Sequence, residues 1–239
     1  MSRYYYDLHI HSCLSPCGDM ESTPASIAGM AKLNGLNMVA LTDHNTTLNC
    51  PAFFKACEQY DIVPIAGMEL TTAEDIHVVC LFPTLEDAMA YNELVDKKRI
   101  KIKNKEKIFG VQSIVDEEDR EIGREEDLLV NATQIPIESV QELVRQCNGA
   151  AYPAHIDRSS NGAIAMLGDF PHNCGFTAFE LQDPENETEY RETYHLENLR
   201  LVVSSDAHYL WKIKEKREFF ELSDDPAEAR NQLIEMLRG

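Results

Sequence analysis

Residues 4–12, YYYDLHIHS, begin the pattern that decides the fold. The run Tyr4 to Ile10 is short and rich in aromatic and branched residues, which favours a β-strand. A polar loop leads to Thr23-Pro24, a helix cap followed by proline at the first helical position, and Asn34-Gly35 closes that helix. The next strand is expected at Asn37 to Thr42. A strand, a helix and a strand in this order predict a parallel sheet whose strands are joined by helices.

The same alternation of short apolar runs and amphipathic stretches continues through the rest of the chain. We expect further strands at Ile62 to Glu69, His77 to Phe82, Ala150 to Ala154, Thr177 to Leu181 and Leu201 to Ser204. Helices are expected around Phe53 to Cys57, over Pro136 to Gln146, and from the Asp225-Pro226 cap onward. The short connection before His77 predicts that this strand is antiparallel to the preceding one. The pattern indicates a single α/β domain, either a barrel or an open doubly wound sheet.

Residues 85–133 interrupt the alternation and are interpreted as an insertion. Lys97 to Lys107 contains seven basic residues, and Asp116 to Asp127 contains eight acidic ones. We expect the first part of the insertion to be a charged helix, and Phe109 to Val115 to form a hairpin with Leu128 to Val130. An exposed excursion is the simplest interpretation, and a substrate lid or a dimer arm is the alternative.

The charge of the chain is strongly negative. The 239 residues include 22 Lys and Arg against 41 Asp and Glu, which gives a formal net charge of −19. Long-range repulsion would oppose binding to a phosphate backbone or an anionic membrane. We therefore expect neither a long nucleic acid nor a membrane as a partner. A small anionic substrate remains compatible, provided that bound cations reverse the potential locally.

The seven cysteines are expected to be reduced, because their number is odd and they are spread over a mid-sized chain. No basic and then apolar leader precedes Tyr4, and no run approaches about 20 apolar residues, so we expect a soluble, cytoplasmic protein. Cys13 and Cys17 lie in the first loop. Their pair lacks the four thiolates of a structural zinc or iron–sulfur site, so small buried residues are favoured over metal ligands or a redox switch.

Histidines and carboxylates gather at the ends of the expected strands. His9 and His11 are two residues apart and project to one face of a strand, and Asp206 and His208 repeat that spacing. The carboxyl ends of barrel strands meet at one rim. Residues at or next to strand termini there are Asp43, His44, Glu69 and His155, together with His77 at the start of the antiparallel strand. Independent buried imidazoles would each need a separate partner, so this combination predicts a metal centre.

These residues resemble the PHP superfamily of polymerase-associated and histidinol-phosphatase domains. The motifs that carry the resemblance are His9-Ile10-His11, Thr42-Asp43-His44, Gly67-Met68-Glu69, His77, His155 and Ser205-Asp206-Ala207-His208. The resemblance implies a distorted, TIM-like (β/α)7 barrel with two or three divalent ions. It implies one ion on His9, His11, Glu69 and Asp206, a second on Glu69, His77 and His155 with Glu69 bridging, and a third on Asp19, His44 and His208. The spacing around Asp19 departs from the shorter form frequent in the family.

The predicted function is metal-dependent hydrolysis of a small phosphate ester by metal-activated hydroxide, with nucleotide or sugar phosphomonoesters ahead of diesters. Imidazole and carboxylate ligands suit Zn, Mn or Fe. Arg158 is expected to clamp a phosphate oxygen, and Asp43 to orient a ligand or to take a proton from bound water. The alternatives are a histidinol-phosphate phosphatase, another metal hydrolase and a noncatalytic, metal-binding regulatory module. No lysine ends a strand, which disfavours an amide-hydrolysing barrel.

Overall fold

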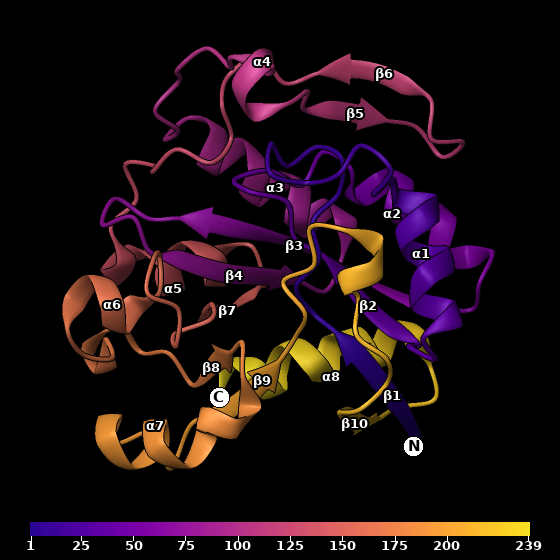
Figure 1. The fold of residues 1–239 in the computed structure, drawn as a ribbon. Helices are drawn as coiled ribbons and strands as arrows, with labels where there is room; N and C mark the ends of the chain where they lie inside the picture. The colour runs from indigo at the N-terminus through magenta and orange to yellow at the C-terminus, as the bar shows by residue number, and fades with distance from the viewer.

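A curled six-stranded sheet, in the order β10-β1-β2-β3-β4-β7, forms the centre of the computed structural model, which describes residues 1–239 (Figure 1). Its strands are β1 (Ser2–Asp7), β2 (Met38–Leu41), β3 (Val63–Thr71), β4 (His77–Phe82), β7 (Ala150–Pro153) and β10 (Phe219–Leu222). The strands β1, β2 and β3 are parallel, and β4 is antiparallel to both β3 and β7. The predicted antiparallel pairing of β4 is confirmed. We did not predict β10, which pairs antiparallel with β1.

Two more strands extend the curl of the sheet toward a barrel. The strands β8 (Ala178–Leu181) and β9 (Arg200–Val203) form a parallel pair, and β8 lies beside β7. On the far side, Ile10 forms a parallel bridge with Ala207, and the Leu8 N–H donates to Ser204 Oγ. The strands β1, β2, β3, β4, β7, β8 and β9 therefore form the predicted distorted seven-stranded barrel.

Eight α-helices connect or follow the strands. They are α1 (Pro24–Leu33), α2 (Cys50–Glu58), α3 (Leu85–Asp96), α5 (Ile137–Gln146) and α8 (Pro226–Arg238), with the shorter α4 (Glu106–Phe109), α6 (Ala163–Leu167) and α7 (Glu187–Tyr194). Three 3₁₀ turns complete the set: η1 (His172–Cys174), η2 (Pro184–Asn186) and η3 (Leu210–Lys212). The side chain of Thr23 accepts from the Ser26 N–H, and that of Asp225 accepts from the Glu228 N–H, so both cap predictions are confirmed.

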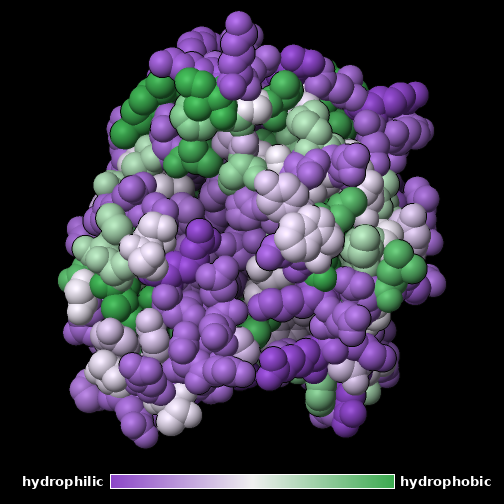
Figure 2. Space-filling view, viewed as in Figure 1, coloured by the Kyte–Doolittle hydropathy of each residue, from purple (hydrophilic) through white to green (hydrophobic).

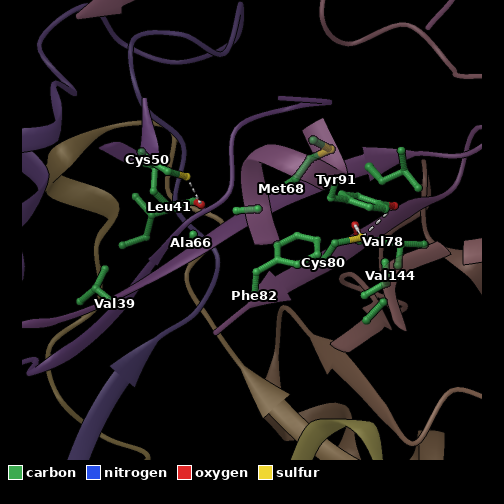
Figure 3. Close-up of a cluster of buried hydrophobic side chains, with 14 of the residues drawn as sticks. Val39, Leu41, Cys50, Ala66, Met68, Val78, Cys80, Phe82, Tyr91 and Val144 are labelled. Atoms are coloured by element: carbon green, nitrogen blue, oxygen red, sulfur yellow. Dashed lines mark hydrogen bonds between the residues drawn. The ribbon is translucent and has the colours of Figure 1, made fainter. Parts of the chain in front are cut away.

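Alternate residues of the strands pack on opposite faces of the sheet. In β2, Met38 and Ala40 belong to a buried cluster with Leu233 and Leu237 of α8. Val39 and Leu41 belong to the other cluster, which includes residues of α1, α2, α3 and α5. Figure 3 shows part of this second cluster, where the Cys80 thiol lies 3.7 Å from the Tyr91 hydroxyl and Cys50 approaches the Leu41 carbonyl. Apolar layers on both faces hold the strand ends rigidly in place.

The insertion lies over the edge of the barrel near α1 and α2 (Figure 1). Its first part is the helix α3, whose Ala88, Tyr91 and Val95 are buried in the core rather than part of an exposed excursion. The basic run from Lys97 to Lys107 lies almost entirely outside a helix, so the expected charged helix is wrong there, and the predicted hairpin partner is wrong too. The strand β5 (Ser113–Val115) pairs with β6 (Glu121–Arg124), not with residues 128–130. The Asp116 carboxylate accepts from the Glu118 and Arg120 N–H groups and folds the acidic stretch into a tight turn.

The insertion is tied to the loop that follows β2. The Asn45 amide donates to the Leu129 and Asn131 carbonyls, and its oxygen accepts from the Thr71 N–H. Asn45 directly follows His44, so the insertion contacts the segment that carries one of the predicted ligands. No helix of the structure is both long enough and apolar enough to cross a bilayer.

Candidate metal centre

The barrel gathers most of the predicted ligands at one rim. His9 and His11 follow β1, His44 follows β2, Glu69 lies in β3 and His77 begins β4, whereas His155 follows β7 and Asp206 and His208 follow β9. Five of these side chains are almost completely buried: His9, His11, His44, Glu69 and His155. The rim therefore has eight of the nine predicted ligands, and Asp19 is the exception.

Glu69 is the centre of the arrangement, because five imidazoles surround its carboxylate. The ring nitrogens of His9, His77 and His155 lie 3.3, 2.8 and 3.0 Å from Oε1. Those of His11 and His44 lie 3.2 and 3.0 Å from Oε2. A carboxylate in this position can bridge two cations, one at each oxygen.

The donor atoms form three overlapping groups, and within each group they lie within 4.8 Å of one another. The groups are His9, His11, Glu69 and Asp206; His44, Glu69 and His77; and His11, His44 and His208. Buried polar atoms without a hydrogen-bond partner include Glu69 Oε2, Asp206 Oδ1 and His44 Nδ1. Each such orphaned atom costs about 1–3 kcal/mol unless something satisfies it. Mixed imidazole and carboxylate donors left unpaired in this way fit divalent cations such as Zn, Mn or Fe.

The backbone is strained at two of these residues. His155 and Asp206 have φ values of 29° and 50°, which is the left-handed region that non-glycine residues avoid. Such conformations cost on the order of 1–3 kcal/mol and persist only where the surroundings impose them. His155 lies two residues after the end of β7, and Asp206 lies three residues after the end of β9. The strained conformations turn both side chains toward the group around Glu69.

Glu180, which we did not predict, holds two of the ligands. Its Oε1 lies 2.9 Å from His9 Nδ1 and 3.1 Å from the backbone nitrogen of His155, which donates to it. A proton on His9 Nδ1 leaves the lone pair of Nε2 directed at the Glu69 carboxylate, which suits metal ligation. The signal for Glu180 in the sequence was a charged residue inside the apolar run of β8.

Asp43 holds His11 through a serine. The Ser15 hydroxyl donates to Asp43 Oδ1 at 2.7 Å and lies 2.9 Å from His11 Nδ1. Because the Ser15 proton is committed to Asp43, His11 Nδ1–H donates to Ser15, so the neutral form of the ring has its lone pair on Nε2. The Ser12 hydroxyl and N–H donate to the same carboxylate. Asp43 is buried and accepts three hydrogen bonds from these donors, so the geometry favours the orienting role over the proton-accepting one.

The charges in the site are set by this clustering. Burial alone would raise the pKa of Glu69, but His77 and His9 outweigh it and hold that pKa well below its ordinary value. Burial opposes the ionisation of Asp206 too, yet His9 and His11 lower its pKa. Burial and the neighbouring His11 lower the pKa of His208 to about 3. Both carboxylates are therefore ionised and His208 is neutral at pH 7, which are the forms that bind metals.

Asp19 does not join the donor groups. Its carboxylate accepts from the Glu21 N–H within its own turn at 2.9 Å, although its backbone N–H donates to the His208 carbonyl. The Cys17 thiol instead contacts His44. Burial of the His44 ring opposes its charge, but Cys17 and Glu69 raise the pKa of that imidazole to about 9. The assignment of Asp19 as a ligand thus remains a prediction without support from the position of its side chain.

A cavity of about 340 Å³ opens beside the donor groups, lined by Arg158, Asp206, His208 and Lys212 among others. Arg158 donates to Asp206 Oδ2 at 2.6 Å, and about a third of its side chain is exposed. Figure 2 shows that this face of the molecule is hollowed at its centre and that hydrophilic residues line the hollow. A substrate in this cavity would meet Arg158 and the donor groups together.

The barrel with a histidine and carboxylate rim around a shared glutamate defines a metal-dependent hydrolase. More specifically, the chain belongs to the PHP family, since the family model described as PHP domain matches residues 7–225. The family resemblance of the sequence is thereby confirmed. No curated protein matches the chain.

Several solved structures share the fold. The lesion-specific endonuclease Endonuclease Q from Pyrococcus furiosus is 21% identical, with a TM-score of 0.68 over 98% of this chain and 56% of that chain. Endonuclease Q in complex with a 27-mer duplex that has an abasic lesion at the active site is 20% identical, with a TM-score of 0.69 over 98% of this chain and 57% of that chain. A candidate metal-dependent phosphoesterase from Bifidobacterium adolescentis is 18% identical, with a TM-score of 0.57 over 93% of both chains. The chain spans little more than half the length of the Endonuclease Q chains.

The expectation that a long nucleic acid is excluded as a partner is wrong. Endonuclease Q has this fold and was solved with a DNA duplex at its active site. The exclusion rested on the net charge of −19, which sums over the whole surface. The potential at a site depends instead on charges within about a Debye length, roughly 8 Å at physiological ionic strength, and on bound cations. The preference for a small ester over a nucleic acid loses its basis for the same reason.

Proposed function

We propose that the protein is a metal-dependent phosphoesterase. The observation that carries the proposal is the Glu69 carboxylate surrounded by five imidazoles, next to an open cavity that presents Arg158. Phosphate esters are anionic, so a site for them needs concentrated positive charge and a planar cationic donor. Both are available at this rim.

The proposed ligand sets follow the donor groups. His9, His11, Glu69 and Asp206 would hold one divalent ion, Glu69, His77 and His155 a second, and His44 and His208 would contribute to a third. His155 fits the second set because its Nε2 lies 3.3 Å from His77 Nδ1 and 3.0 Å from Glu69 Oε1. When bound, Zn, Mn or Fe ions in such a site neutralise phosphate oxygens and lower the pKa of a coordinated water.

The residues of the chain supply orientation and charge. Arg158 is anchored by one nitrogen on Asp206, which leaves its other N–H groups to bind a nonbridging phosphate oxygen. Glu180 and Asp43 fix the tautomers of His9 and His11, so that the neutral form of each ring presents an unprotonated Nε2 to a metal ion. Because these anchors are buried and rigid, little reorganisation accompanies substrate binding.

The test is a phosphatase and phosphodiesterase screen of the protein reconstituted separately with Mn, Zn and Fe. p-Nitrophenyl phosphate, bis(p-nitrophenyl) phosphate, nucleotides, sugar phosphates and histidinol phosphate serve as substrates. We expect metal-dependent ester cleavage that His9→Ala abolishes, whereas His172→Ala, at an exposed position outside the rim, retains it. Arg158→Ala should raise KM for the ester that is cleaved. Absence of cleavage of every ester with every metal would refute the proposal and favour the noncatalytic alternative.

A further inference from the structure

Three cavities adjoin one another, and residues 209–218, which follow the proposed ligand His208, contribute to the lining of all three. Ser205 lines both the cavity beside the donor groups and a second cavity of about 300 Å³. Tyr6 and Arg217 line this second cavity and a third of about 430 Å³. The three cavities together are called the groove below. The groove starts at Asp206 and His208 and continues alongside β9 as far as Arg200.

The charge balance of the groove differs from that of the chain as a whole. Its cationic lining residues are Arg158, Arg191, Arg200, Lys212, Lys214 and Arg217, and its anionic ones are Asp7, Glu187, Asp206, Glu215 and Glu218. Six of the 22 basic residues of the chain thus line the groove, against only five of the 41 acidic ones. Two of the five, Asp7 and Asp206, are buried at the metal centre. An extended polyanion therefore meets less repulsion along the groove than the net charge of the whole chain suggests.

An exposed aromatic pair lies at the mouth of the groove. Trp211, the only tryptophan of the chain, is 71% exposed, and its ring centroid is 5.9 Å from that of Tyr209, which lines the first cavity. The Lys212 ammonium lies 4.4 Å from the centroid of the Trp211 ring. Exposure of a large aromatic ring to water is unfavourable, whereas a nucleobase can stack on the ring. A neighbouring cation such as the Lys212 ammonium can bind the adjacent phosphate.

We propose that the groove binds a single strand of nucleic acid, with one phosphodiester at the metal centre and an unpaired base stacked on Trp211. The inference rests on the proposed phosphoesterase function and names its substrate class. A strand is favoured over a free nucleotide because every one of the three cavities has at least one cation, and a mononucleotide would use only the first. A single strand is favoured over a duplex because stacking on Trp211 requires a base that is free of its partner.

The sole tryptophan makes the proposal directly measurable. The metal-loaded protein is titrated with an unlabelled dT12 oligonucleotide while tryptophan fluorescence is followed, and with fluorescein-labelled dT12 while anisotropy is followed at several salt concentrations. We expect quenching of Trp211 and an affinity that falls with salt. Trp211→Ala should weaken dT12 binding by about tenfold or more, and Arg217→Ala should reduce the salt slope by about one. Lys55→Ala, on the exposed side of α2, is the matched control and should bind as the parent protein does.

The outcomes separate this proposal from the proposed function. Binding of dTMP as tightly as dT12, tighter binding of a blunt duplex than of the single strand, or equal binding by Trp211→Ala and Lys55→Ala would each overturn the strand proposal. If dT12 fails to bind while p-nitrophenyl esters are cleaved, the strand proposal is wrong and the phosphoesterase proposal stands. If dT12 binds through Trp211 and no ester is cleaved with any metal, the phosphoesterase function is wrong and the groove serves only in binding.

Discussion

The substitution Glu180→Gln tests whether a buried carboxylate that is not one of the proposed metal ligands controls the affinity of the protein for divalent ions. Glu180 Oε1 lies 2.9 Å from His9 Nδ1 and 3.1 Å from the His155 nitrogen, and the residue is only 1% exposed. Glutamine keeps the size and an acceptor oxygen but removes the charge. Hydrogen bonds to a charged group contribute about 1.5–3 kcal/mol, against about 1 kcal/mol for neutral pairs. The weaker anchor should also relax the strained backbone of His155 and let its ring turn away.

The expected result is a loss of about 10- to 100-fold in metal affinity, the usual effect of removing a group that holds a metal-ligating histidine. The affinity is measured at pH 7.5 by competition with a chromophoric zinc chelator, and the number of bound ions by elemental analysis. Glu192→Gln, at an exposed position of α7, is the control for the loss of one negative charge. If the two variants bind zinc within twofold of each other, the anchoring role of Glu180 is refuted.

Three further predictions address the metals, the packing and the titration of the rim. Removal of bound metal with a chelator should lower the unfolding temperature by roughly 5–10 °C in calorimetry. The reason is that ions at about 100 times their Kd contribute about 2.7 kcal/mol to the free energy of unfolding. An unchanged unfolding temperature would contradict the metal centre. Gly67→Ala should destabilise the protein by about 1–3 kcal/mol in urea unfolding, since a Cβ there would meet Thr42 Cγ2 at 2.8 Å and Leu81 Cδ2 at 2.9 Å, and it should shift Glu69 as well. Burial raises the pKa of Asp7 to about 6, so its ionisation destabilises the metal-free fold as pH rises from about 4 to 7. Asp7→Asn should therefore gain stability over the parent protein across that range, by up to about 3 kcal/mol, and a difference that does not change with pH would show that Asp7 is not buried as described.

Local signals in the sequence were sufficient for much of the fold. The Thr23-Pro24 and Asp225-Pro226 caps fix helix starts through contacts within three residues, so no tertiary information is needed. The strand β4 was predicted with its observed bounds, because its apolar run is delimited by His77 and by Pro83. The spacing of His9 and His11 likewise determines that both project to one side, whatever the strand pairs with.

Features that depend on distant contacts could not be predicted in this way. The strand β10 is defined by its pairing with β1, more than 210 residues earlier in the chain, and its exposed residues alternate with buried ones too briefly to stand out. The hairpin partner of β5 depends on how tightly Asp116 folds the acidic turn. The positions of Cys17 and Asp19 depend on the contact between the Asp19 N–H and the His208 carbonyl, which no spacing within the loop reveals.

The net charge is the most instructive case, because the same number supports opposite conclusions at two length scales. Summed over the chain, −19 suggests repulsion of any polyanion. Screening limits that repulsion to about 8 Å, so a strand in the groove responds mainly to the basic residues that line it and to the cations bound beside Glu69. Acidic surface elsewhere, such as the eight carboxylates from Asp116 to Asp127, disfavours binding at those places. A nearly neutral groove at a cation-binding rim is therefore suited to leading a polyanion to the metal centre, even in a chain whose net charge is strongly negative.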